Sequence, residues 1–229
     1  ESIMELEWNH VYHPAPFPLT DIQAVFTEGI TCILGDDLEG KQLLFQFTTA
    51  VRAPMQGQVR FLGYDTAMLG NAYTDHISYA GQYPFYPPEI TLYQYLIHTS
   101  LTQRLSAREA TCKSEELLWE SGYPELRSVP IGELPLSARR HIQLLQTLCS
   151  EAPVLILNEP FTNLDPGARK QMDTLLADHM DEKIILVFTQ KEDPFPDLPC
   201  QFHTLHKGRL TSWRRKNTAQ PPYHLLLAQ

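Results

Sequence analysis

The first third of the chain alternates between apolar and polar positions and is interrupted by short apolar runs. Residues 4–11 place apolar side chains at nearly every second position, and residues 58–64 and 77–80 are further short strand-like segments. Such a period of two is typical of half-buried strands. Residues 30–34 are mainly apolar and end at a glycine, which predicts a buried strand leading into a loop. Residues 41–51 contain no Gly or Pro, so we expect a helix after that loop.

The middle of the chain changes to helical spacing. Residues 93–105, 107–120 and 138–149 repeat apolar side chains at intervals of three and four and contain few strand formers. Ser106 and Ser137 stand at the start of two of these segments and are expected to be helix N-caps. The pattern predicts a helical part inserted between two strand-rich parts.

The last third alternates again between strands and a helix. Residues 154–157 are continuously apolar, as in a strand of a parallel sheet, and residues 184–188 form a second run of this kind. A helix is expected between them, at about 167–180. Residues 202–205 and 209–213 predict a terminal hairpin. The order of elements predicts an α/β core that carries a helical subdomain.

Composition narrows the class of protein. The 229 residues are 43% hydrophobic, and 18 basic against 27 acidic residues give a net charge of -9. A chain this acidic lacks the basic footprint of a nucleic-acid-binding protein, so no nucleic-acid partner is expected. The four cysteines are far apart and the nine histidines are scattered, so we expect no metal site and a reducing compartment. Neither a signal peptide nor an apolar run long enough to span a membrane is visible.

One loop carries the clearest candidate chemistry. Residues 35–42 keep the frame of a phosphate-binding loop through Gly35, Gly40 and Lys41, but Gln42 stands where a Ser or Thr normally ligates Mg²⁺. Three acids occupy the interior of this loop: Asp36, Asp37 and Glu39. They either stand where the phosphates' own charge would lie, or face solvent, or pair with the lysine. The loop predicts an ATP-binding fold that has lost some or all of its ATP chemistry.

A second block of residues carries a resemblance to a known family. The strand at 154–157 ends in Asn158-Glu159-Pro160, and residues 162–166 read Thr-Asn-Leu-Asp-Pro. Together with the loop upstream, this block resembles the nucleotide-binding domain of ABC transporters, over about residues 6–210. The resemblance implies an α/β fold with a P-loop NTPase-like ABC ATPase core, an antiparallel β subdomain and an inserted α-helical subdomain. It implies a single domain over residues 1–229, with the helical subdomain at about 87–149 and a C-terminal extension at about 216–229.

The resemblance also assigns roles to individual positions. It implies vestigial catalytic positions at Glu159, matching the general base, and at Gln190, in place of the switch histidine. It implies contacts to a membrane-spanning partner from Gln82, Tyr83, Phe85 and Tyr86, with simple packing as the equal alternative for the three aromatic side chains. It places a degenerate nucleotide site at Tyr12, Gly35, Gly40, Lys41, Gln42, Gln82, Asn158 and Asp165.

The substitutions at these positions weaken the implied chemistry. Gln42 and Asn158 both replace groups that support Mg²⁺, so the hard-oxygen environment of the ion is lost. Gln190 has no imidazole for the γ-phosphate, and residues 134–137 read Leu-Pro-Leu-Ser where the family's signature has Leu-Ser-Gly-Gly. We therefore expect no firmly bound cofactor and no metal, and ATP with Mg²⁺ at most weakly.

The expected function follows from this loss. The sequence predicts a non-hydrolysing ATP-binding-cassette subunit that binds a membrane-spanning ABC transporter subunit at the cytoplasmic face of the membrane. A second nucleotide-binding subunit, identical or different, is a further expected partner. Two alternatives stay open: a slow but genuine ATPase that powers ABC export, and a soluble scaffold or regulator.

Overall fold

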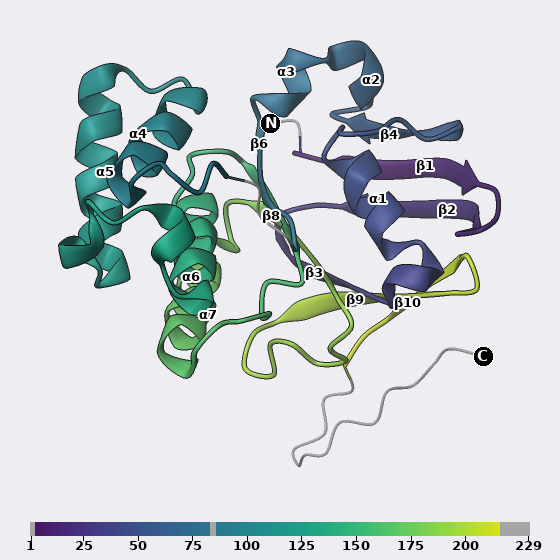
Figure 1. Ribbon diagram of the computed structural model, residues 1–229. Helices are drawn as coiled ribbons and strands as arrows, with labels where there is room; N and C mark the ends of the chain where they lie inside the picture. The colour runs from purple at the N-terminus through teal and green to yellow at the C-terminus, as the bar shows by residue number, and fades with distance from the viewer. Residues whose placement is uncertain (1–2, 83–85, 216–229) are drawn as a thin grey trace. The chain divides into compact units, whose positions relative to one another are not determined.

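The computed structural model describes residues 3–82 and 86–215, and the chain packs into two compact units (Figure 1). The first unit is formed by the residues up to 79, by 152–159 and by those from 176 onwards. The second unit is formed by residues 80–151 and 160–175. Each unit has its own apolar cluster, so each is described by itself.

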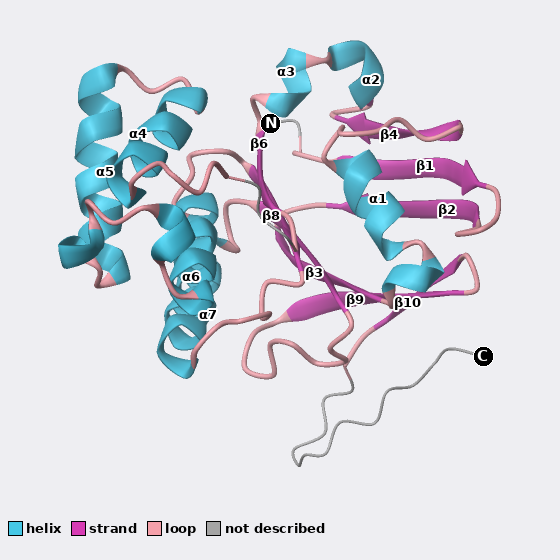
Figure 2. Ribbon diagram, in the orientation of Figure 1, coloured by secondary structure: helices cyan, strands magenta, loops and turns pink. Residues whose placement is uncertain are grey.

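An antiparallel sheet of four strands begins the first unit (Figure 2). Its strand order is β2-β1-β4-β5, and the pairing of β1 with β2 shifts register twice. The alternation predicted at 4–11 is seen in β1, where every second side chain is buried up to the first shift. The strands are β1 (Leu6–His13), β2 (Leu19–Phe26), β4 (Gln56–Phe61) and β5 (Tyr64–Asp65).

A six-stranded sheet in the order β10-β9-β3-β8-β7-β6 carries the parallel strands. β3 pairs in parallel with β8 and β9, and β7 pairs in parallel with β8. Every residue of β7 and β8 is buried, as their continuous apolar sequence requires. The strands are β3 (Gly29–Leu34), β6 (Ile77–Ala80), β7 (Val154–Asn158), β8 (Ile184–Thr189), β9 (Cys200–His206) and β10 (Arg209–Trp213).

Short helices complete the first unit. They are the 3₁₀ helix η1 (Asp37–Glu39), α1 (Lys41–Thr48), α2 (Thr66–Leu69) and α3 (Asn71–Thr74). The buried Trp8 contacts Phe26 edge-on at 4.7 Å and donates a hydrogen bond from Nε1 to Thr48 Oγ1 at 3.0 Å. This bond satisfies the indole N–H and ties α1 to the antiparallel sheet.

The second unit is built from helices around a leucine-rich cluster. Thr91 and Ser106 each form a complete capping box, with Gln94 and Glu109 respectively, so both N-termini have partners for their free N–H groups. The elements are α4 (Leu92–Thr102), α5 (Ala107–Ser121), η2 (Pro124–Leu126), η3 (Ile131–Glu133) and α6 (Leu136–Leu148), followed by α7 (Pro166–His179), which extends from this unit into the first.

Most predicted elements are confirmed, but one N-cap is wrong and some short elements, β2, α2 and α3 among them, were not predicted. The expected N-cap at Ser137 is wrong, because α6 begins at Leu136 after Pro135 and has no side-chain cap. β2 was not predicted, because polar residues such as Asp21 interrupt its apolar positions and Asp21 itself has a positive φ of 52°. No helix among the described residues is both long enough and apolar enough to cross a membrane.

Acid should weaken the first unit through His203. This side chain is 8% exposed on β9, its ring lies edge-on to Phe26 at 5.8 Å, and burial lowers the pKa of His203 to about 4. The folded state therefore keeps the ring neutral while the unfolded chain takes up a proton below about pH 6.5. Stability is fully present above that pH and falls as the pH drops towards 4, by up to about 3 kcal/mol.

Urea unfolding at pH 7.5, 5.5 and 4.5 measures this loss. His203→Phe should remove most of the difference between pH 7.5 and 4.5, whereas His98→Phe, at an exposed position on α4, should leave it unchanged. An equal pH dependence in wild type and His203→Phe would contradict the assignment.

Candidate nucleotide site

The loop that follows β3 is folded into a short helical turn that uses its own polar groups. Asp36 caps η1, and its Oδ1 accepts a hydrogen bond from the Glu39 N–H at 3.1 Å. The Gly40 N–H donates to the Asp37 carbonyl oxygen at 3.4 Å. Gly40 has a φ of +89°, and a Cβ there would lie 2.7 Å from Leu19 Cδ2, so glycine is required where α1 begins. Two backbone N–H groups that could face an anion are thus engaged inside the loop.

Lys41, the first residue of α1, is completely buried and ion-paired. Its Nζ contacts Glu159 Oε1 and lies 3.3 Å from Asp37 Oδ1. Asp37 belongs to the same loop, one helical turn before the lysine. The ammonium group therefore already has two carboxylates beside it, one local and one from the end of β7.

Glu159 is held by more than this ion pair. Its φ is +46°, and its N–H donates to the Phe188 carbonyl oxygen at 2.8 Å, which fixes the backbone beyond β7. Oε1 accepts a hydrogen bond from the Gln190 N–H at 2.8 Å, and Oε2 accepts one from the Thr189 hydroxyl at 3.2 Å. The carboxylate is 9% exposed and has partners on both oxygens. Sequence reasoning missed Thr189, which is an ordinary β8 residue by pattern.

The two positions that replace magnesium-supporting groups contact each other. Asn158 Nδ2 donates a hydrogen bond to Gln42 Oε1 at 2.7 Å. Asn158 is fully buried at the end of β7, and Gln42 is the second residue of α1. A neutral amide–amide bond therefore stands at the two positions where the resemblance expects hydroxyl and carboxylate oxygens.

An open pocket of about 680 Å³ adjoins the loop in the first unit. Three acids line it, and Glu39 among them accepts a hydrogen bond from the Lys207 N–H and lies 3.3 Å from His206 Nδ1. The side chains of Leu34, Leu205 and Trp213 supply the apolar lining. The full lining is Leu34, Gly35, Asp36, Glu39, Gln190, Glu192, Thr204, Leu205, His206 and Trp213.

The remaining nucleotide-site candidates are distributed over both units. Tyr12 on β1 is 36% exposed, and Gln190 is exposed just after β8, both in the first unit. Gln82 and Asp165 belong to the second unit. Asp165 caps α7, since its Oδ1 accepts a hydrogen bond from the Ala168 N–H at 2.9 Å.

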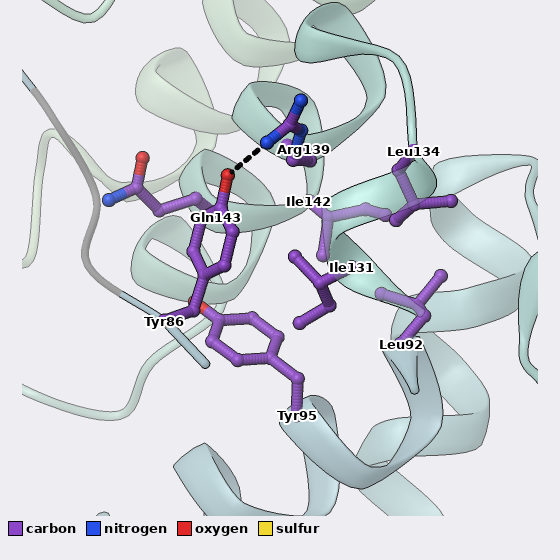
Figure 3. Close-up of a pocket in the computed structure, with 8 residues that line it drawn as sticks. All are labelled: Tyr86, Leu92, Tyr95, Ile131, Leu134, Arg139, Ile142 and Gln143. Atoms are coloured by element: carbon purple, nitrogen blue, oxygen red, sulfur yellow. Dashed lines mark hydrogen bonds between the residues drawn. The ribbon is translucent and has the colours of Figure 1, made fainter. Parts of the chain in front are cut away.

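Tyr86, an expected partner contact, is engaged within the second unit (Figure 3). Arg139 Nη1 donates a hydrogen bond to its hydroxyl at 2.8 Å, and its ring lies edge-on to Tyr95 at 6.3 Å. The residue is half-buried and, with Tyr95 and Arg139, lines a small apolar pocket. Tyr83 and Phe85 lie outside the described residues.

No group of three or more His, Cys, Asp or Glu side chains is arranged to hold a metal ion within residues 3–82 and 86–215. The side-chain oxygens of Gln42 and Asn158 stand at the two positions where the resemblance expects groups that support Mg²⁺. One of these, Gln42 Oε1, already accepts the amide hydrogen bond.

Comparison with known proteins identifies the family. The ABC transporter family profile matches residues 21–162, which is more than half of the chain. The chain belongs to the ABC transporter family. The fold and the matched residues are those of the family's ATP-binding domain.

Individual relatives of this ABC transporter domain are distant. The cytochrome c biogenesis ATP-binding export protein CcmA of Pasteurella multocida is 26% identical over 200 residues, covering 85% of this chain and 88% of CcmA. The thiamine import ATP-binding protein ThiQ of Salmonella typhimurium is 28% identical over 198 residues, covering 84% of this chain and 81% of ThiQ.

A solved structure, the ATP-binding subunit of an ABC transporter, superposes with a TM-score of 0.80 at 21% identity. The superposition covers 91% of this chain and 89% of the other. It confirms the predicted α/β fold of the ABC domain. The roles that the resemblance assigns to single residues, and the subdomain boundaries, stay predictions.

Proposed function

We propose that this ABC-family chain does not hydrolyse ATP and works by holding a membrane-spanning partner at the cytoplasmic face of the membrane. The observation that carries the proposal is the buried Lys41, whose ammonium is already paired with Glu159 and Asp37. A nucleotide phosphate needs that ammonium as its counter-charge. In this chain two carboxylates of the protein itself already lie beside the ammonium group of Lys41.

The charge balance opposes phosphate binding. A phosphate approaching Lys41 must displace Asp37 or Glu159, or accept them as neighbours. Like charges about 5 Å apart repel by about 3 kcal/mol at an effective dielectric of about 20, and each 1.4 kcal/mol is a factor of about ten in affinity. Solvent reduces this for Asp37, whose side chain is 46% exposed, but much less for Glu159, at 12%.

The metal requirement is equally poorly met. Mg²⁺ needs oxygens in near-octahedral geometry and dehydrates reluctantly. Gln42 Oε1 is the acceptor of the Asn158 amide, so ligation would break a hydrogen bond between partly buried groups. Without the ion, the charge of the β- and γ-phosphates is not neutralised.

These contacts argue against the alternative of a slow ATPase. A general base must accept a proton from the attacking water. Both oxygens of Glu159 already accept bonds, from the Gln190 N–H and from the Thr189 hydroxyl, and Oε1 also contacts the lysine. The site is arranged to hold this carboxylate in place as a structural anion.

The partner is proposed from family membership. Similar proteins are described as ATP-binding proteins of a thiamine importer and of a cytochrome c biogenesis exporter. We place the contact at residues 82–88 and expect a second nucleotide-binding subunit, identical or different, beside this one. Because Tyr86 is tied to Arg139, the side chains of Tyr83 and Phe85 are the better candidates for anchors.

Purification from detergent-solubilised membranes tests this function. The tagged chain should co-purify with a protein that has membrane-spanning helices, without added nucleotide and in the presence of EDTA. Tyr83→Ala with Phe85→Ala should reduce recovery of that partner about tenfold, as expected from losing aromatic anchors. Trp119→Ala, which removes a 72% exposed aromatic on α5 outside the segment, is the matched control and should not.

The same preparation decides between the alternatives. Steady phosphate release by the purified complex, abolished by Glu159→Gln at a temperature where the variant is folded, would make the chain a working ATPase. If all of the protein is instead recovered in the membrane-free fraction, the scaffold or regulator is favoured.

A further inference from the structure

Two cysteines meet on neighbouring parallel strands of the first unit. In the pairing of β3 with β9, Ile30 lies opposite Cys200 and Cys32 lies opposite Phe202. Cys32 and Cys200 are thus two residues apart in register and on the same face of the sheet. Their side chains are therefore diagonal neighbours across the β3–β9 pair, and neither cysteine is in a disulfide.

A fixed arginine lies beside the outer of the two sulfurs. The Arg215 guanidinium donates a hydrogen bond to Asp193 Oδ1 at 2.7 Å, and its positive charge acts on the Cys200 thiol. It also donates to the carbonyl oxygens of Phe195, at 2.9 Å, and Leu198, at 3.1 Å, so its position is set by the loop before β9. A cation held in this way stabilises a thiolate.

The two sulfurs have opposite environments. The hydrogen bond from Cys32, and then the charge of Arg215, lower the pKa of the Cys200 thiol, against burial and the carboxylate of Asp193. Burial raises the pKa of Cys32 well above its usual value. Cys32 is fully buried whereas Cys200 is half-buried, so the sulfur that favours the thiolate is also the more accessible one.

We propose that Cys200 is a peroxide-reactive thiolate and that Cys32 is the thiol that resolves its oxidised form. The Cys200 thiolate attacks one oxygen of hydrogen peroxide; the O–O bond breaks, an S–O bond forms and the leaving hydroxide takes up a proton to become water. The Cys32 thiol then attacks the sulfenic sulfur, an S–S bond forms, and the departing hydroxyl leaves as water with the Cys32 proton. Two thiols lose two electrons and one peroxide becomes two waters.

The place of the pair in the sheet gives oxidation a defined consequence. Cys200 is the first residue of β9 and follows Pro199. Formation of the disulfide would therefore move the end of a strand and not its centre. β3 runs from Cys32 directly to Gly35 and the loop that leads to Lys41 at the start of α1. The disulfide would tie β9 to the strand that leads into this loop, and would close a very long stretch of chain, which raises the Tm of the oxidised protein.

Alkylation by iodoacetamide, mapped by mass spectrometry, tests the thiolate. Cys112 is exposed on α5 and serves as the internal control, because accessibility alone would make it the fastest. We expect Cys200 to react about tenfold faster than Cys112 at pH 7, and to keep its reactivity to lower pH, as a stabilised thiolate does. Cys112 reacting faster than Cys200 across the pH range would overturn the proposal.

Variants separate the two sulfurs. With one equivalent of hydrogen peroxide, wild type should yield a Cys32–Cys200 linked peptide, and Cys32→Ser should instead accumulate a dimedone adduct on Cys200. Arg215→Lys, which keeps the charge, should retain the fast reaction, and Arg215→Gln should lose it. Equal rates in these two variants, with equal Tm, or a linked peptide that does not contain Cys200, would also overturn the proposal.

Discussion

Replacing Lys41 by Met will cost the protein about 3 kcal/mol of unfolding free energy, because it leaves a buried carboxylate without its counter-charge. Lys41 is fully buried and Glu159 is 9% exposed, so solvent cannot replace the lost partner. Glu159→Gln should be similarly destabilising, since it removes the charge that faces the ammonium. The double variant should recover about 2 kcal/mol relative to the sum of the two single losses.

Urea unfolding of the four proteins in this cycle measures the coupling. Arg127 and Glu115, 46% and 39% exposed and 2.8 Å apart, are the matched surface pair. Arg127→Met, Glu115→Gln and their double variant should show a coupling below about 1 kcal/mol. A Lys41→Met protein as stable as wild type would mean that the ion pair is not part of what holds this fold together, and would remove the main support for a self-occupied site.

Restoring the loop and the metal-supporting positions will raise MgATP affinity at least about 100-fold, from a wild-type Kd above about 1 mM. The substitutions form two sets, a loop arm and a metal arm. The loop arm consists of Asp36→Asn, Asp37→Asn, Leu38→Gly and Glu39→Ala. It removes three negative charges near Lys41, and a reduction of about 1.4 kcal/mol in repulsion for each gives about tenfold in affinity.

The metal arm carries Gln42→Ser and Asn158→Asp. It replaces the amide–amide hydrogen bond by a hydroxyl and a carboxylate, which are ligands that Mg²⁺ accepts. Its effect should appear only with Mg²⁺ present, whereas the loop arm should also improve binding of ATP in EDTA.

Titration calorimetry of wild type, each arm and the combination separates the two causes. The matched control removes three acids on the same unit away from the loop: Asp178→Asn, Asp181→Asn and Glu182→Gln. A tenfold gain in this control would show that net charge, and not the loop, limits binding. Micromolar affinity in wild type would defeat the proposed loss of nucleotide binding.

Much of the fold follows from local pattern. Residues 154–157 and 184–188 are apolar without interruption, and such runs have few alternatives to a strand buried on both faces. Ser106 with Glu109 forms the predicted start of α5, because a capping box is a contact between near neighbours. β2 escaped prediction because the irregular pairing of β1 and β2 breaks the period of two on which the pattern depends.

For the candidate site, the local pattern predicted the residues but not the contacts between them. Gly35, Lys41, Gln42, Asn158 and Glu159 were all identified by type and spacing. Which side chain pairs with which was not, because the partners are far apart in the chain: 118 residues separate Lys41 from Glu159, and 116 separate Gln42 from Asn158.

The sheet decides these pairings. β3 and β7 flank β8 in parallel, so the loop after β3 and the end of β7 arrive at the same edge of the sheet. The sequence by itself determined the family, most of the strands and helices, and the residue types at each motif position, because these depend on local spacing. Only the tertiary structure decided that Glu159 and Asp37 neutralise Lys41 and that Asn158 bonds Gln42, because such contacts depend on strand order and burial, which no local pattern records.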